Sequence, residues 1–198
     1  MPSSEHVGEV VAGPEVLEHL VRDPVLARLI ARHGPARWGV HPPFHALVRA
    51  VVGQQLSNQV ARTLFRRLKA RTGLRPEVLA GLSDEDYLAL GLARAKGRTL
   101  REAALRWETI APHLAGSDDE VRSRLTALKG VGPWTADMVL IFGLGREDVW
   151  PVEDLGLLRQ VEAAYGVRGR AAAREIGERF RPYRSHAAHY LWAAHDVG

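Results

Sequence analysis

The chain has 198 residues, which is enough for one sizeable apolar core or for two small lobes that share one. It contains no cysteine, which excludes disulfides, thiolate metal sites and cysteine nucleophiles, so any chemistry must come from carboxylates, histidines, hydroxyls or lysines. The 27 basic residues outnumber the 23 acidic ones, and the net charge of +4 suits a polyanionic partner. No apolar run could cross a bilayer and no signal sequence is recognisable, so we expect an intracellular protein.

Residues 1–12 are polar and are expected to form a flexible tail, followed by one folded unit over residues 13–198. Residues 38–43 are expected to be a connector, and only residues 148–152 suggest strand-like alternation. Apolar residues at helical spacing predict helices over most of the remaining chain. In chain order these helices cover residues 14–21, 24–33, 44–52, 59–71, 76–82, 84–90, 93–111, 119–127, 133–142, 155–165, 170–180 and 183–194. The predicted fold is therefore all-α, with two interleaved helical lobes and a cleft between them.

The stretch from Leu128 to Asp137 predicts two helices joined by a glycine-containing hairpin. Ser117 and Glu120 resemble a capping box before the first helix. Gly130 and Gly132 allow positive φ and a close backbone approach, and Pro133 suits a first helical turn because its missing N–H would be unpaired there. We expect the second helix to end at Gly143, a favoured residue after a helix.

Backbone N–H groups at such a hairpin lie at the positive end of a helix, which is a favourable place for a phosphate oxygen. Lys129 adds a charge beside it, so nucleic-acid backbone is the expected ligand. The alternative is that Gly-Val-Gly-Pro is only a tight turn between packed helices.

Asp154 is predicted to cap the next helix, where the helix dipole favours a negative charge. The helix at residues 133–142 leads the chain away by about 15 Å. The nine residues 145–153 can span up to about 30 Å, so the chain can bring Asp154 back near the hairpin. Glu153 and Asp148 are the rival carboxylates, but one precedes the presumed cap and the other lies in the connector.

Two further residue types are expected to be structural. Three tryptophans, Trp107, Trp150 and Trp192, are expected to belong to the core. The histidines His186, His189 and His195 have no cysteine or well-spaced carboxylate beside them, so no metal site is expected there.

Taken together, these motifs resemble the helix-hairpin-helix DNA glycosylases, and most closely the AlkA-type 3-methyladenine DNA glycosylases. The resemblance rests on Leu-Lys-Gly-Val-Gly-Pro-Trp-Thr-Ala and Val-Trp-Pro-Val-Glu-Asp-Leu-Gly. It is supported by Arg-Ala-Val-Val-Gly-Gln-Gln-Leu-Ser from residue 49 and by Arg-Pro-Tyr-Arg-Ser from residue 181. These segments are scattered over residues 44–192. Only about forty residues precede the Phe44 helix, so we expect a short form without the N-terminal α/β domain of full-length AlkA.

The resemblance implies that Asp154 is the catalytic acidic residue. It implies no required cofactor, but a monovalent cation held by backbone carbonyls near Leu128 and Val131. Trp134 stands where bifunctional glycosylase–lyases carry their Schiff-base lysine, so a monofunctional enzyme is expected. The expected substrate-pocket residues are Trp134, Met138, Tyr183 and Leu155. The expected DNA-binding residues are Gln54, Gln55, Leu56, Ser57, Lys129, Gly130, Val131, Gly132 and Thr135, and either Gln55 or Leu56 fills the gap left by the flipped base.

The implied function is base-excision repair, in which a cytoplasmic, monomeric enzyme hydrolyses the N-glycosidic bond of alkylated bases such as 3-methyladenine and 7-methylguanine in double-stranded DNA. An alkylated purine is cationic and already a good leaving group, so one carboxylate suffices. Two alternatives stay open: a non-catalytic protein that binds DNA structures, and a glycosylase for oxidised or deaminated bases.

Overall fold

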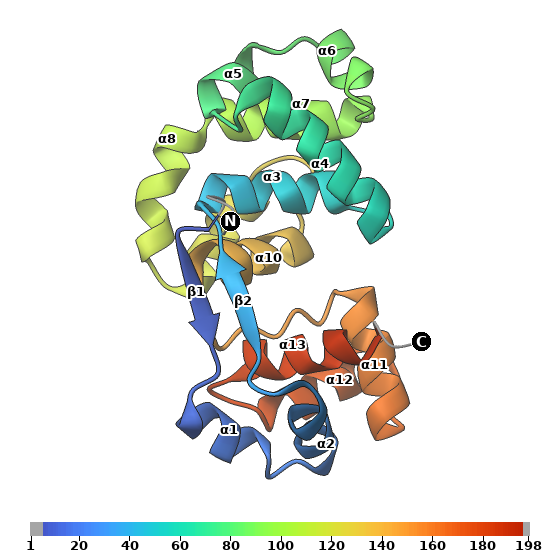
Figure 1. Ribbon diagram of the computed structural model, residues 1–198. Coiled ribbons are helices and arrows are strands. Elements are labelled where there is room, and N and C mark those ends of the chain that lie inside the picture. The colour runs from blue at the N-terminus through green and yellow to red at the C-terminus, as the bar shows by residue number, and fades with distance from the viewer. Residues whose placement is uncertain (1–5, 196–198) are drawn as a thin grey trace. The chain divides into compact units, whose positions relative to one another are not determined.

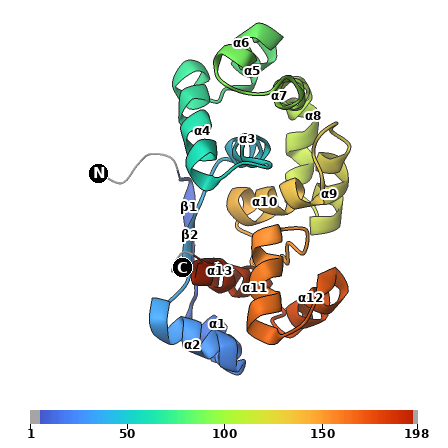
Figure 2. The ribbon, with the colours of Figure 1, turned by 90° about the vertical axis from the view of Figure 1, so that its right-hand side faces the viewer.

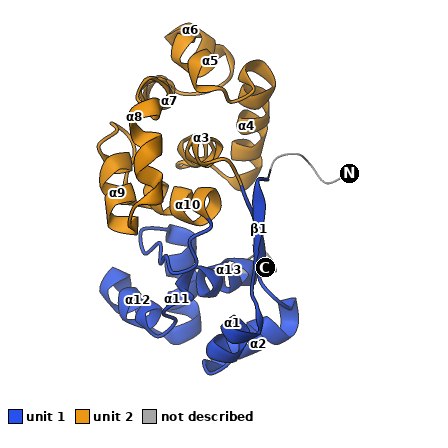
Figure 3. Cartoon of the chain, turned by 90° about the vertical axis from the view of Figure 1, so that its left-hand side faces the viewer, with its two compact units in different colours: residues 1–40, 145–198 blue, residues 41–144 orange. Residues whose placement is uncertain are grey.

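The computed structural model describes residues 6–195, and over this range the fold is almost entirely helical (Figure 1). The described residues form thirteen α-helices, one 3-10 helix and two short strands, which confirms the all-α prediction. Contacts within the chain define two compact units (Figure 3). Unit 2 consists of residues 41–144, and unit 1 is built from the segments on either side of it. None of the described helices is both long and apolar enough to cross a membrane.

Unit 1 has a small antiparallel sheet and five helices. Its elements are β1 (Gly8–Val11), α1 (Pro14–Leu20), α2 (Pro24–His33), β2 (Arg37–Val40), α11 (Leu155–Tyr165), α12 (Gly169–Glu178) and α13 (Arg184–His195). Helix α13 packs against α2 and α11, and the core includes Leu20, Leu26 and Phe180. The buried hydroxyl of Tyr190 accepts a hydrogen bond from Ala36 N–H (2.9 Å) and donates one to Gly34 O (3.0 Å), which joins α13 to the turn before β2.

The two strands correct the sequence prediction. Residues 8–11 fall within the predicted tail, and residues 38–40 within the predicted connector; the structure pairs them in the register Gly8 with Val40 to Val11 with Arg37. The first five residues of the predicted tail lie outside the described range. Four residues are too few for an alternation to be recognised in the sequence. The stretch at 148–152, which suggested a strand, is irregular in the structure.

Unit 2 is helical throughout. Its elements are α3 (Pro43–Gly53), α4 (Asn58–Thr72), α5 (Pro76–Gly81), α6 (Asp84–Ala89), α7 (Arg94–Leu105), α8 (Trp107–Ile110), the 3-10 helix η1 (Ala111–Ala115), α9 (Asp118–Thr126) and α10 (Pro133–Leu144). Helix α3 is its central element, because seven of its eleven residues are buried. It packs against α4, α7 and α10, and Figure 2 views it nearly end-on among its neighbours.

Two helix ends in unit 2 differ from the prediction. Helix α10 continues through Gly143 to Leu144, because Gly143 lies where α10 touches α3: a Cβ there would be 3.0 Å from that of Ala46. The left-handed residue is instead Gly145, with φ of +65°. The predicted helix at 93–111 breaks at Arg106, and the following turn packs the ring of Trp107 against that of Phe44, with centroids 4.9 Å apart.

Side chains cap several helices of the described chain, including the predicted caps Ser117 and Asp154. Asp23, Ser57, Ser83, Ser117 and Asp154 each accept a backbone N–H of the first turn that follows. Ser83 and Asp86 form a complete capping box. At Ser117 the structure shows the serine half, while the carboxylate of Glu120 lies 3.2 Å from His113 Nδ1.

Two histidines of α13 are enclosed beside Trp38 of β2. The ring of His186 lies 4.8 Å and that of His189 5.2 Å from the Trp38 ring, and the Nδ1 atoms of both are buried without a hydrogen-bond partner among the described residues. Burial lowers the pKa of each imidazole below its ordinary 6.5; Glu147 opposes this at His186, and the backbone of Arg37 opposes it at His189.

We therefore expect acid to destabilise unit 1. The unfolded chain takes up protons on these histidines near pH 6.5, where the folded protein holds them neutral, so the free energy of unfolding decreases as the pH falls below that value. Denaturant unfolding between pH 7.5 and 5 measures the decrease. His189→Gln should reduce it, whereas His33→Gln, at an exposed position, should not. Equal pH dependence in all three proteins would contradict the assignment.

Candidate functional site

The hairpin between α9 and α10 is a tight turn that depends on one glycine. Gly130 has φ of +88°, and a Cβ at this position would be 2.2 Å from Thr99 Oγ1. The N–H of Val131 donates to Leu128 O (3.1 Å), and the N–H of Ala136 donates to Gly132 O (3.1 Å), which starts α10. Gly132 does not have a positive φ, so that part of the prediction is wrong.

Side chains from two other helices hold this turn. The Gln54 side-chain amide, at the end of α3, donates to Gly130 O (3.0 Å) and to Thr135 Oγ1 (2.9 Å). The Thr99 hydroxyl of α7 donates to Lys129 O (2.9 Å). The hairpin and the 54–57 segment therefore belong to one hydrogen-bonded group within unit 2.

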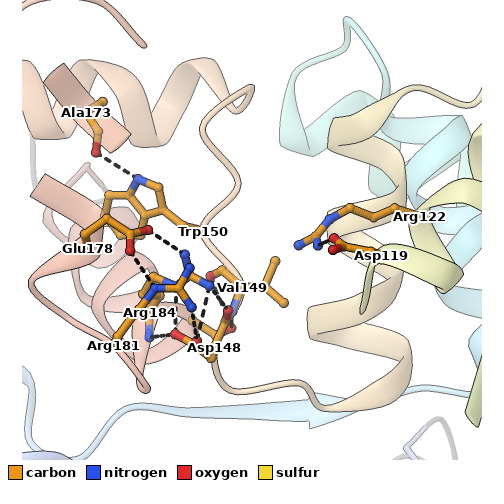
Figure 4. Close-up of polar contacts among 10 residues, drawn as sticks. Asp119, Arg122, Asp148, Val149, Trp150, Ala173, Glu178, Arg181 and Arg184 are labelled. Atoms are coloured by element: carbon orange, nitrogen blue, oxygen red, sulfur yellow. Dashed lines mark hydrogen bonds and ion pairs between the residues drawn. The ribbon is translucent and has the colours of Figure 1, made fainter. Parts of the chain in front are cut away.

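A charged pair joins the two helices of the hairpin. Asp137 of α10 is 6% exposed, and its Oδ1 accepts a hydrogen bond from Arg122 Nε of α9 (2.8 Å). Arg122 also reaches Asp119 at 3.2 Å (Figure 4). A buried carboxylate requires such a partner, so this pair joins α9 to α10.

The predicted DNA-binding residues of unit 2 differ in how far they are exposed to solvent. Gln55, Ser57, Lys129 and Gly130 are exposed, and Leu56 retains 37% of its surface. Thr135 and Val131, by contrast, are 1% and 5% exposed, so their side chains support the turn from inside. Their assignment as DNA-binding residues stays a prediction.

The predicted pocket residues Trp134 and Met138 lie one turn apart on α10. Trp134 is half-buried and Met138 is 9% exposed. Residues four apart on a helix share a face, so the two side chains occupy the same side of α10.

Asp154 of unit 1 is held at the start of α11. Its Oδ1 accepts the N–H of Leu157 (2.7 Å) and the indole N–H of Trp192 from α13 (3.0 Å). The side chain is partly exposed, and the next residue, Leu155, is 58% exposed. A carboxylate fixed in this way can stabilise a developing positive charge or orient a water molecule.

The hydrogen bond from Trp192 to Asp154 was not predicted from the sequence. It was expected in the core together with Trp107 and Trp150. Trp150 is indeed buried, with its indole N–H bonded to Ala173 O (3.0 Å). Trp192 is 38 residues away from Asp154 in the sequence, and nothing local to either residue signals that they meet.

The two rival carboxylates are both engaged by arginines. Glu153 pairs with Arg170 at 2.8 Å and with Arg174 at 3.8 Å. Asp148 pairs with Arg181 at 3.0 Å and with Arg184 at 2.7 Å. Asp148 and Glu153 therefore act as structural anchors, and Asp154 remains the candidate for chemistry.

The Arg181–Ser185 motif attaches the loop before Asp154 to α13. Arg184 donates to the carboxylate of Asp148 and to its carbonyl (2.7 Å), and also to Glu178 (3.0 Å), as Figure 4 shows. The Ser185 hydroxyl donates to Arg146 O (2.8 Å) and accepts the N–H of Val149 (2.9 Å). The ion pairs with Arg181 and Arg184 lower the pKa of Glu178. This motif fixes the path of the chain toward Asp154.

Tyr183, another predicted pocket residue, is half-buried at the start of the α13 segment. Its ring meets that of His19 edge-on, with centroids 5.5 Å apart. Among the described residues no group of three or more His, Cys, Asp or Glu side chains is arranged to hold a metal ion. Any cation at the hairpin would have to use backbone carbonyls.

Comparison with known proteins gives a consistent result. The sequence matches the family described as "HhH-GPD superfamily base excision DNA repair protein" over residues 48–184. It is 31% identical over 182 residues to DNA-3-methyladenine glycosylase 1 of Schizosaccharomyces pombe, covering 84% of this chain and 79% of that protein. It is 35% identical over 161 residues to the probable bifunctional transcriptional activator/DNA repair enzyme AlkA of Mycobacterium tuberculosis, covering 73% of this chain and 32% of that protein. The solved structure of S. pombe 3-methyladenine DNA glycosylase Mag1 in complex with abasic DNA gives a TM-score of 0.85 at 28% identity, covering 93% of this chain and 98% of that one.

The two hairpin glycines should differ in their effect on stability. Gly130→Ala places a side chain at positive φ and against Thr99, and should reduce the free energy of unfolding by about 1–3 kcal/mol. In Gly132→Ala the new Cβ has no described atom within 4 Å beyond its chain neighbours, so the free energy of unfolding should change by less than about 0.5 kcal/mol. Urea unfolding of both variants tests this, and equal effects would contradict the turn geometry.

Proposed function

Because the chain belongs to the HhH-GPD superfamily of base excision DNA repair proteins, we propose that it is an alkylbase DNA glycosylase of the AlkA type. The resemblance found in the sequence is confirmed by this family match. The reaction is hydrolysis of the N-glycosidic bond that joins an alkylated base to deoxyribose in double-stranded DNA. The observation that carries the proposal is the carboxylate of Asp154, held at a helix N-terminus by Leu157 N–H and Trp192 N–H.

Asp154 stabilises the sugar as the bond breaks. The C1′–N bonding pair leaves with the base and cancels the positive charge that alkylation gave it, while positive charge develops on the deoxyribose. A negative carboxylate stabilises this oxocarbenium-like state, as it does in other glycoside-cleaving enzymes. Water then bonds to C1′, and the carboxylate orients it and accepts its proton.

Selection of the base relies on aromatic rings. We assign Trp134 and Tyr183 to stacking on the cationic base, which gains about 0.5–2 kcal/mol over an aromatic face. Met138 and Leu155 stay predicted pocket residues. Because this discrimination is modest, a broad range of alkylated bases is expected, and the weaker glycosidic bond of the damaged nucleotide supplies the remaining selectivity.

DNA is held through its backbone. The exposed turn at Lys129 and Gly130 offers backbone N–H groups and one cation to a phosphate. Gln55 or Leu56, exposed on the neighbouring segment, fills the gap left when the target nucleotide leaves the stack.

Trp134 stands at the position of the lyase lysine, so the enzyme is proposed to be monofunctional, with water as the nucleophile. We also retain a monovalent cation at the carbonyls of Leu128 and Val131 as a proposal. A neutral all-oxygen donor set suits a hard cation of low charge, and Leu128 O keeps one lone pair after accepting Val131 N–H. We also propose that the protein is cytoplasmic and monomeric, and that it associates with the nucleoid when it binds DNA.

Asp154→Asn tests the catalytic assignment with little effect on the fold. Asparagine is as good an N-cap as aspartate, and its Oδ1 can accept the same two N–H groups, so only the charge is lost. Release of 3-methyladenine or 7-methylguanine from methylated DNA should fall by about 100-fold or more. Glu153→Gln, the matched control, removes only an anchor to Arg170 and should keep nearly full activity.

A lesion panel distinguishes the alternatives. Oxidised and deaminated bases should be released more slowly than alkylated purines, and faster release would reassign the substrate. If the native protein binds DNA but releases no base, it is a non-catalytic DNA-structure binder, and the proposal fails.

Trp192→Phe tests the hydrogen bond to Asp154. Phenylalanine keeps an aromatic ring but has no N–H to hold Oδ1, so the carboxylate can rotate away from its productive position. We expect kcat on methylated DNA to fall by about tenfold, with DNA affinity changed by less than about twofold. Unchanged kcat would show that Leu157 N–H alone positions Asp154.

A further inference from the structure

The turn that follows α3 contains a strained residue. Gln55 has φ of +55°, in the left-handed region that residues other than glycine rarely adopt. It is exposed, so packing of its own side chain does not hold it there. Such residues persist only where the surrounding structure fixes them, and they are frequent at functional sites.

The side chain of Lys96, in α7, restrains this turn. Its Nζ lies 2.7 Å from both Val52 O and Gln54 O and donates a hydrogen bond to each carbonyl. The ammonium group thus sits at the C-terminal end of α3, where a positive charge is favoured by the helix dipole. Gln54 O belongs to the peptide group that immediately precedes Gln55, so its orientation sets the φ of Gln55.

The hairpin also holds the side chain of Gln54, and the turn itself is closed by a hydrogen bond from Leu56 N–H. The Gln54 amide reaches Gly130 O and Thr135 Oγ1, while Leu56 N–H donates to Gly53 O (3.2 Å). Lys96 is half-buried, and burial lowers the pKa of its ammonium group. Its contacts with the carbonyls of Val52 and Gln54 indicate a structural role in this turn.

We propose that Lys96 is a positioning residue whose ammonium group holds the Gln54–Gln55 turn in the strained conformation that presents Gln55 and Leu56 to the DNA stack. This inference rests on the proposed function, because it concerns how the glycosylase keeps a nucleotide everted. Lys96 does not touch the substrate; it acts through the backbone of the turn.

The activity test compares Lys96→Met with Lys96→Arg and with Arg98→Met, a control at an exposed position on the same helix. Each is assayed on a duplex with a paired 7-methylguanine and on one with the same lesion as an unpaired bulge, which needs little force to evert. Lys96→Met should lower kcat about tenfold on the paired duplex and less than about threefold on the bulge, with affinity for undamaged duplex unchanged within about twofold. Lys96→Arg should recover part of the loss, and Arg98→Met should behave as the native protein. Equal loss on both duplexes, or none, overturns the proposal.

A stability test separates this inference from the proposed function. Gln55→Gly removes the strain in advance. In the native protein, loss of Lys96 lets the turn relax, and the released strain offsets part of the lost contacts, so Lys96→Met should destabilise the native protein less than it destabilises the Gln55→Gly protein. An equal cost in both backgrounds shows that Lys96 does not hold the turn, and overturns the proposal. If the native protein releases no base from either duplex, the proposed function fails, and this cycle still decides whether Lys96 restrains Gln55.

Discussion

The side-chain amide of Gln54 is the interaction on which the arrangement of unit 2 depends. It donates simultaneously to Gly130 O in the hairpin and to Thr135 Oγ1 in α10. Each bond alone is modest, contributing about 1 kcal/mol, but together they set the spacing between two segments that are 76 residues apart in the sequence. In the proposed function the 54–57 segment enters the DNA stack and the hairpin binds the DNA backbone, so the two must keep a constant separation, which the Gln54 hydrogen bonds provide.

The charged groups of the chain divide between scaffold and chemistry. Asp137 and Asp148 are bound to arginines, and Glu153 is bound likewise at the surface. These ion pairs anchor a helix or a loop. Asp154 accepts N–H groups from Leu157 and Trp192, and these two hydrogen bonds orient its carboxylate.

Local signals in the sequence predicted much of this structure. Caps such as Ser117 and Asp154, and the glycine at 130, act within a few residues, so they can be recognised without knowledge of the fold. The strands were missed because they are stabilised by pairing with each other, and the break at Arg106 because Trp107 packs on Phe44 across unit 2. Asp154 was found as a candidate because its capping signal is local. Its partner Trp192 was not found, because that contact exists only in the folded chain.

The loop before Asp154 is attached to α13, and this affects how the protein folds during its synthesis on the ribosome. Asp148 and Asp154 are translated before Arg184 and Trp192, which hold them and lie 36 and 38 residues further along the chain. Unit 1 also combines the first and the last segments of the described chain, so its core assembles after unit 2 has been made. Asp154 is therefore synthesised before the residue that orients its carboxylate. If Asp154 carries the proposed chemistry, the nascent chain acquires that activity only after α13 has docked.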